Sequence, residues 1–152
     1  MGRQKRVQKA KKSGLIVGRI SMHRKGYGFV EAAEGDIYIS ARDSHGAMHG
    51  DTVGVRLRTG SRMRRSGSVV KVLERANDSI VGFYERHGRT GVVVPHDPRL
   101  RHEVFVGSKD AGGAEPGDVV VVRLTAFPSR DHSAQGVIEE VLGKPDDPGV
   151  DI

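Results

Sequence analysis

Three aromatic residues lie close together in a chain that has few of them. The 152 residues include only four Phe and three Tyr and no Trp, and Tyr27, Phe29 and Tyr38 fall in one short segment. In an extended strand alternate side chains share a face, so we expect Lys25, Tyr27 and Phe29 of the sequence KGYGFV on one side. A neighbouring strand DIYIS would place Tyr38 beside them. Because unpaired bases stack on rings with a cation nearby, the pattern predicts binding of single-stranded RNA.

Basic residues lie beside these rings and in two further segments. His23 and Arg24 adjoin Lys25, where a phosphate backbone would pass, although His23 is equally well explained as a surface histidine. The turn at residues 58–65 carries four arginines, and it is either an RNA-contacting hairpin tip or a solvated loop. Residues 1–13 contain six Lys and Arg and no acidic residue, which is typical of a flexible arm. The predicted RNA-binding set is His23, Arg24, Lys25, Tyr27, Phe29, Tyr38, Arg62, Arg64 and Arg65.

The overall composition favours a polyanionic partner and excludes several kinds of chemistry. The formal net charge is +6 and the pI is near 9.9, although an anionic membrane surface would satisfy the same charge. No segment is long and apolar enough to span a bilayer and no secretory segment follows the basic start, so we expect a cytoplasmic protein. The absence of cysteine excludes disulfides, thiolate metal sites and a cysteine nucleophile.

No arrangement of residues indicates a catalytic or metal site. His45 and His49 are four residues apart, but the glycine between them argues against a helix that would align them as metal ligands. Asp97 follows His96 at a proline-flanked turn, where a carboxylate more often caps the turn than activates a nucleophile. We therefore predict no catalytic residue, no metal ligand and no cofactor in this chain.

An internal repeat predicts two small domains. AMHGD at residues 47–51 precedes an alternating apolar run, and AEPGD at residues 114–118 precedes an equivalent run. Short Val- and Ile-rich segments separated by glycine recur throughout, and no stretch shows a convincing 3.6-residue period. An all-β chain with about five strands per copy predicts two tandem, five-stranded Greek-key OB-fold barrels. The predicted plan is a basic flexible arm (1–13), a first barrel (14–75), a second barrel (79–145) and a tail (146–152).

The second copy keeps this frame and loses most of the rings. The sequence GVVV at residues 91–94 replaces the aromatic strand of the first copy. Phe105, within EVFV, is the expected counterpart of Tyr38, but the alternation around it favours the core side. We expect this barrel to guide an RNA backbone more than to bind bases.

These motifs resemble a known family. KGYGFV followed by DIYIS resembles the paired RNA-binding motifs of cold-shock domains in order and separation, whereas in an RRM domain the partner motif lies upstream and helices intervene. The succession GYGFV, AMHGD, VLER, IVG, VVPHD, PGDVVVV and EVLG before DDPGVDI is similar to the tandem cold-shock region of the ribonuclease R and ribonuclease II family. Met22 and His23 occupy the stretch where cold-shock proteins usually place Trp and Phe, so we expect weaker stacking.

The resemblance implies a module that captures single-stranded RNA for a catalytic domain. That domain, which in the family degrades RNA processively from the 3′ end with magnesium bound by aspartates, is expected to be absent here and to be a further candidate partner. We interpret Asp146, Asp147 and Asp151 as part of a solvated linker because no second set of ligands accompanies them. The chain by itself is therefore expected to have no hydrolase activity.

Two other interpretations of the rings remain open. An exposed apolar patch also marks protein interfaces, so the rings could bind a protein partner or a second copy of the chain. A translation-associated OB protein would instead prefer structured RNA.

Overall fold

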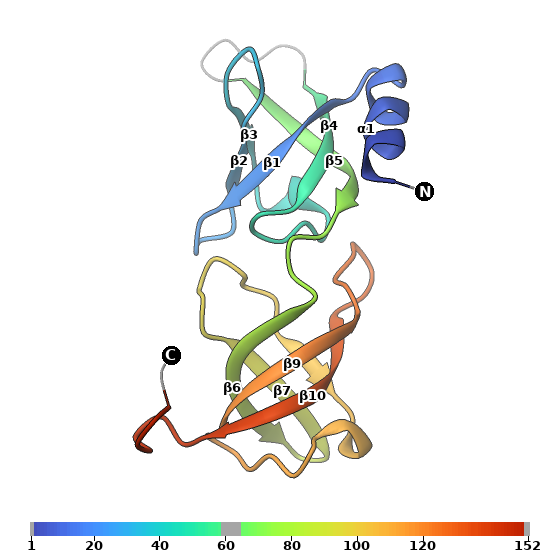
Figure 1. Cartoon of the computed structure of the whole chain (residues 1–152). Helices are drawn as coiled ribbons and strands as arrows, with labels where there is room; N and C mark the ends of the chain where they lie inside the picture. Colours follow the sequence, from blue (N-terminus) through green and yellow to red (C-terminus); the bar gives the residue numbers. More distant parts are fainter. Residues whose placement is uncertain (1, 59–64, 151–152) are drawn as a thin grey trace. The chain divides into compact units, whose positions relative to one another are not determined.

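The computed structural model describes residues 2–58 and 65–150. The chain divides into two units, Met1–Asn77 and Asp78–Ile152. Each unit contains one closed barrel of five strands (Figure 1). The prediction of two small all-β barrels in tandem is therefore confirmed.

The first barrel is closed by one parallel and four antiparallel strand pairs. Its strand order is β1-β2-β3-β5-β4, and the parallel pair is β3 with β5. The strands alternate inward apolar residues with outward residues, and their inward side chains form a core of Val, Ile and Met. The elements of this unit are α1 (Arg3–Lys12), β1 (Ile16–Met22), β2 (Gly28–Val30), β3 (Ile37–Ile39), a 3-10 turn (Arg42–Ser44), β4 (Thr52–Leu57) and β5 (Ser66–Glu74).

The second barrel has the same topology as the first. Its strand order is β10-β8-β7-β6-β9, with β10 and β8 as the parallel pair. Tyr84 on β6 is 2 % exposed and lies in the core at the position that Ile20 has in the first barrel. The elements are β6 (Ser79–His87), β7 (Thr90–Pro95), β8 (Val104–Val106), a 3-10 turn (Ser108–Asp110), β9 (Val119–Ala126) and β10 (Ala134–Gly143).

The repeated Gly-Asp pair has the same structural role in both barrels. The Asp51 carboxylate accepts a hydrogen bond from the backbone N–H three residues earlier at 2.8 Å and one from Arg75 at 3.1 Å. The Asp118 carboxylate likewise accepts from the N–H three residues earlier at 2.8 Å and from Lys144 at 2.8 Å. Arg75 and Lys144 each follow the last strand of a barrel, so the carboxylate ties the start of the fourth strand to the end of the fifth.

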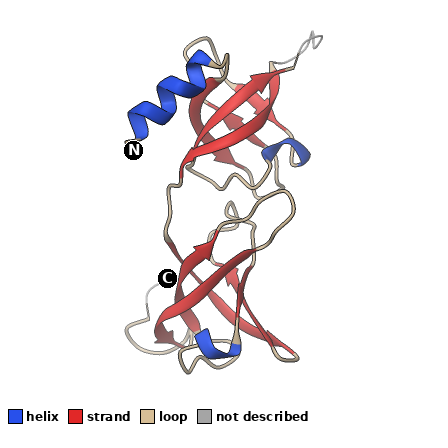
Figure 2. Ribbon diagram, turned by 90° about the vertical axis from the view of Figure 1, so that its right-hand side faces the viewer, coloured by secondary structure: helices blue, strands red, loops and turns tan. Residues whose placement is uncertain are grey.

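The N-terminal segment differs from the prediction. Where the sequence predicted a flexible arm, Arg3–Lys12 form α1, which lies beside the first barrel (Figure 2). Val7 and Ala10 share one face of this helix and pack against Leu15 and Leu73. A ten-residue helix is marginal by itself, so this packing is what holds it, and two apolar residues among six cations were too weak a signal to predict it. No helix in the described part of the chain has the length and apolar character needed to cross a membrane.

Candidate nucleic-acid interface

Tyr27, Phe29 and Tyr38 form a cluster of rings, called here the ring cluster, on the outer face of β2 and β3. Phe29 and Tyr38 are direct partners in the antiparallel pairing of these strands, and their ring centroids lie 5.6 Å apart. The Tyr27 ring lies 6.1 Å from that of Phe29 and 5.9 Å from that of Tyr38. The pairing of β2 with β3 therefore brings the three rings into contact with one another.

The strand geometry keeps this cluster at the surface. Val30, Ile37 and Ile39 point into the core and have no exposed surface, whereas Phe29 between them in the register is 36 % exposed. A Cβ at Gly28 would lie 2.7 Å from the backbone carbonyl oxygen of Ser21 on β1, so a glycine at this position lets the two strands lie close together. A large apolar side chain that stays exposed to solvent on a well-packed barrel is typical of a surface that binds a partner.

A tight turn between β1 and β2 adds a fourth ring. The His23 imidazole stacks on Tyr27 with centroids 4.7 Å apart and planes 9° from parallel. The turn is closed by the His23 N–H, which donates to the Tyr27 carbonyl at 2.7 Å. His23 was predicted to adjoin the rings where a phosphate backbone would pass, and in the structure its own ring extends the ring cluster. The signal that could have shown this is the four-residue spacing of two rings across a glycine turn.

Arg24 and Lys25 are the exposed cations next to the ring cluster. Lys25 was expected on the same strand face as the rings, but it lies in the turn, because Gly26 has a φ of 102° and ends the alternation there. The Lys25 N–H donates to His23 Nδ1 at 3.1 Å, which fixes the turn while the Lys25 side chain stays in solvent. Two cations at the edge of a ring surface can contact the phosphates of a strand whose bases stack on the rings.

The turn at residues 58–65 was predicted to be either an RNA-contacting hairpin tip or a solvated loop, and two of its four arginines have partners in the first barrel. Arg65 donates to the Gly35 carbonyl at 2.8 Å and forms an ion pair with Glu34 at 3.6 Å, so it holds the loop between β2 and β3. Arg58 donates to Asp43 at 2.6 Å. Arg62 and Arg64 lie outside the described residues.

The Asp43 carboxylate is held ionised by its neighbours. Burial raises the pKa of Asp43, but hydrogen bonds from Ser40 and Arg58 and the charge of Arg58 outweigh burial and leave the pKa below its ordinary value. The ionised carboxylate in turn neutralises much of the Arg58 charge. The positive charge beside the rings therefore comes from Arg24 and Lys25 more than from Arg58.

The second barrel carries a single exposed ring at the equivalent place. Phe105 on β8 pairs with Val92 on β7, as Tyr38 pairs with Phe29 in the first barrel. The expectation that Phe105 faces the core is wrong, because its two neighbours in the strand are buried and Phe105 is 37 % exposed. It is therefore a functional candidate that sequence alternation alone misassigned.

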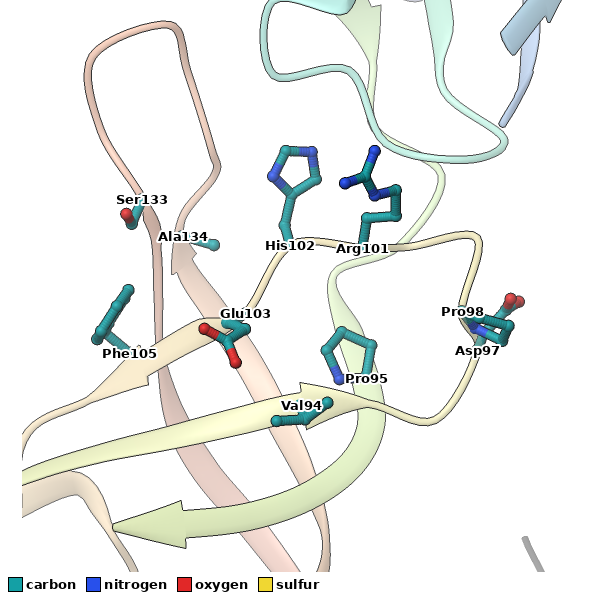
Figure 3. A pocket seen from close by; sticks show the side chains of 10 residues that line it. All are labelled: Val94, Pro95, Asp97, Pro98, Arg101, His102, Glu103, Phe105, Ser133 and Ala134. Carbon is teal, nitrogen blue, oxygen red and sulfur yellow. The ribbon is translucent and has the colours of Figure 1, made fainter. Parts of the chain in front are cut away.

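Two hollows flank Phe105. One has a volume of about 590 Å³ and extends from Phe105 to Arg101 and His102 (Figure 3). The other has a volume of about 360 Å³ and reaches Arg89. Arg101 has a φ of 54°, an uncommon conformation for a residue with a side chain. An exposed ring between hollows with cations at their edges is a smaller version of the surface on the first barrel.

The magnesium that the family resemblance implies belongs to a catalytic domain outside this region, and the aspartates near the end of this chain were interpreted as part of a linker. Asp147 Oδ2 accepts the Lys144 N–H at 2.7 Å and serves the turn after β10. Residues 2–58 and 65–150 contain no group of three or more His, Asp or Glu placed to hold a metal ion. Asp151 lies outside the described residues.

Two OB barrels in tandem, one of them with aromatic side chains exposed beside cations, define a protein of the OB-fold nucleic-acid-binding class. The Ribonuclease B OB domain model matches residues 18–72, and the Cold shock domain model matches residues 93–152. Ribonuclease R of Escherichia coli (strain K12) is 39% identical over 132 residues, and that of Acidithiobacillus ferrooxidans is 35% identical over 143 residues. The chain is therefore similar to the N-terminal tandem OB region of ribonuclease R.

The alignments cover most of this chain and a minor part of each relative. They include 85% of this chain but 16% of the E. coli protein, and 91% of this chain but 33% of the A. ferrooxidans protein. The chain thus spans a third or less of the length of these relatives.

Solved structures share the fold of this chain. Mycoplasma genitalium RNase R, solved in complex with ribose methylated single-stranded RNA, superposes with a TM-score of 0.77 at 17% identity, over 88% of this chain and 22% of that chain. Yeast Ssd1, described as a pseudonuclease, gives a TM-score of 0.77 at 18% identity, over 95% of this chain and 25% of that chain. At these identities the likeness supports the fold.

Proposed function

We propose that this chain is the RNA-capturing module of a ribonuclease R-type 3′-to-5′ exoribonuclease. The observation that carries the proposal is the ring cluster, in which Tyr27, Phe29 and Tyr38 lie within 6.1 Å of one another on an exposed strand pair. A protein of the same fold has been solved with single-stranded RNA, which supports the choice of ligand. Capture of RNA would be a cytoplasmic activity.

Binding would combine stacking and charge. Each base stacked on a ring contributes about 1–3 kcal/mol whatever its identity, so the cluster favours single strands over duplexes, whose bases are already stacked. His23 covers one face of Tyr27, which leaves the other face, Phe29 and Tyr38 for bases. Arg24 and Lys25 would contact the phosphates, and affinity should then fall as salt rises.

Hydrolysis would occur in a catalytic domain outside this region. In this proposal that domain holds the magnesium ions and is the partner to which the module delivers RNA. The yeast pseudonuclease shares the fold of this region, so the barrels by themselves are compatible with either a nuclease or a non-nuclease parent. The proposal for this chain therefore concerns capture, and the chain alone should leave RNA intact.

Fluorescence anisotropy of a labelled single-stranded RNA tests the proposal directly. Replacing Tyr27, Phe29 and Tyr38 together with Ala should weaken binding by about 100-fold or more at low salt, since three stacking contacts are lost. A matched control replaces three exposed apolar residues elsewhere, Val70, Val81 and Val141, with Ala. The control should bind as the wild type does. A ring variant that loses less than about threefold would contradict the stacking role.

The same titration separates the alternatives. If the wild type does not bind RNA even at low salt, the ring cluster is a protein-docking surface, and self-association or capture of a separate catalytic domain should then depend on the three rings. If a hairpin RNA binds more tightly than an unstructured strand, the translation-associated interpretation is favoured.

A further inference from the structure

Helix α1 presents a row of cations on the first barrel, on the flank away from the ring cluster. The helix packs through Val7 and Ala10 against Leu15 and Leu73, and Leu73 lies on β5. The ring cluster lies over β2 and β3, on the opposite flank of the same barrel (Figure 1). The first barrel therefore has two separate positive surfaces.

The arrangement of charge in α1 is not what helix stability would favour. Cations in the last turn interact well with the helix dipole, which explains Lys11 and Lys12. Lys5 and Arg6 lie near the N-terminal end, where the dipole disfavours them, and no acidic residue is present in that turn. Lys5 and Lys9 are also four residues apart and repel each other. The concentration of positive charge in α1 therefore lowers the stability of the helix.

Three of these cations face solvent together. At 100° per residue, Lys5, Lys9 and Lys12 lie within an arc of about 60° that faces away from Val7 and Ala10, and all three are exposed. Their positions span about 10 Å along the helix axis. The ion pair between Arg3 and Glu74, at 3.1 Å, is on the side of the helix that packs on the barrel, so it leaves this row unneutralised.

We propose that Lys5, Lys9 and Lys12 of α1 form a second RNA-binding surface that contacts phosphates of the strand held by the ring cluster. This inference rests on the proposed function. The helix contains no aromatic residue, so it would bind the backbone without stacking on bases. An RNA long enough to pass around the barrel would gain from both surfaces, as in any bivalent contact.

The structure argues against a membrane as the ligand of this helix. A membrane-bound amphipathic helix inserts its apolar face into the lipid. In α1 that face is already used, because Ala10 has no exposed surface and Val7 packs on the same cluster. The part that remains available is polar and basic, which suits a polyanion in solution.

The test compares a short and a long single-stranded RNA, of about 6 and about 24 nucleotides, because an OB fold contacts about 4–16 nucleotides. Replacing Lys5, Lys9 and Lys12 together with Gln keeps helix propensity, since Lys and Gln are similar in this respect. The variant should bind the long RNA about tenfold less tightly at low salt and the short RNA as the wild type does. Its salt dependence for the long RNA should be shallower by about 2 in log–log slope, for three lost phosphate contacts.

Two controls make the outcome specific. Replacing Arg99, Lys109 and Arg123 of the second barrel with Gln removes the same formal charge and should leave both affinities near the wild type. Replacing the three lysines of α1 with Arg should preserve binding of the long RNA, and circular dichroism should show that α1 is intact in every variant.

The outcomes separate this inference from the proposed function. If the lysine variant binds the long RNA as the wild type does, or loses no more than the charge control, the α1 surface serves another partner, such as an acidic protein, and the inference is overturned. If the ring variant retains binding of the short RNA, the proposed function fails instead.

Discussion

The two barrels share a frame and differ in the face that they present. Strand order and the parallel pair are the same in both. At equivalent positions of the outer face, Phe29 and Tyr38 of the first barrel correspond to Val92 and Phe105 of the second. Val92 is 3 % exposed and is not aromatic, so this strand pair of the second barrel has one ring where the equivalent pair of the first has two. The residues that close an OB barrel are therefore different from those that would bind a ligand.

The residues that the two barrels share are those that lie against the backbone of a neighbouring segment. Gly18 and Gly82 occupy equivalent positions in β1 and β6, and a Cβ at either would overlap a carbonyl oxygen of the neighbouring strand. Asp51 and Asp118 each accept a backbone N–H at the turn before the fourth strand. Contacts of this kind tolerate few residue types, whereas an outward side chain is constrained only by solvent and ligand.

The largest effect should come from the shared glycines. Gly18→Ala or Gly82→Ala would force the Cβ against the carbonyl of Glu31 or Val94, and each should destabilise its own barrel by about 3 kcal/mol. Hydrogen exchange resolved barrel by barrel would measure this. Ser21→Ala and Val81→Ala, at exposed positions on the same strands, are the matched controls. Equal protection in a glycine variant and its control would show that the strands can move apart.

The two Gly-Asp turns should differ in how much each stabilises its barrel. Asp51→Ala should destabilise the first barrel by about 2 kcal/mol, because it leaves the N–H of Met48 and the half-buried Arg75 without the buried carboxylate. Asp118→Ala should cost about 1 kcal/mol, since Lys144 is more exposed and can return to water. Urea unfolding of the two variants checks the order. A larger loss for Asp118→Ala would mean that burial of the cation is not what distinguishes the turns.

The equivalent rings should differ in their contribution to RNA binding. Tyr38→Ala should weaken binding by at least about 1 kcal/mol, or fivefold, because it removes one ring and a neighbour of two others. Phe105→Ala should change affinity by less than about twofold, since the second barrel is expected to guide the RNA backbone and a base stacked on Phe105 would add about fivefold or more. Anisotropy titration with single-stranded RNA measures both. A Phe105→Ala loss that matches Tyr38→Ala would make the hollows beside Phe105 a full base-binding site.

The sequence was sufficient to predict the fold and the ring cluster because both depend on local periodicity. Alternation in KGYGFV and DIYIS placed Tyr27, Phe29 and Tyr38 on one face, and the Gly-Asp repeat revealed the second barrel. Each of these signals is contained in a segment of a few residues. They can therefore be recognised without knowledge of the tertiary structure.

The errors came from contacts between segments. The helix α1 is held by Leu73, more than sixty residues away, so the composition of residues 1–13 alone favoured a flexible arm. The stacking of His23 on Tyr27 depends on a turn whose geometry is set by Gly26, and the sequence did not predict it. The pairing of Arg65 with Glu34 was not predicted either, and a role of Arg65 in RNA binding stays a prediction. In each case the partner lies in another element, and no pattern in one segment identifies it.

Acidification should give the smallest difference in stability between the two barrels, because each barrel contains a carboxylate with a lowered pKa. Lys144 and the Glu115 N–H lower the pKa of Asp118, while in Asp43 the opposing effect of burial is outweighed by Ser40 and Arg58. A carboxylate with a folded pKa below its unfolded value of about 3.9 stabilises the protein above that value, and the contribution disappears as pH falls through the folded pKa. Both barrels should therefore lose stability below about pH 4.

Asp118→Asn tests this coupling in one barrel at a time. The amide retains an oxygen for the Glu115 N–H but cannot titrate, so the second barrel of this variant should be less stable at pH 7 and lose less on acidification. Urea unfolding at about pH 7 and pH 3, followed by barrel-resolved hydrogen exchange, measures both. An unchanged acid response in the second barrel would assign its pH dependence to other carboxylates. The first barrel, which retains Asp43, provides the internal reference in the same sample.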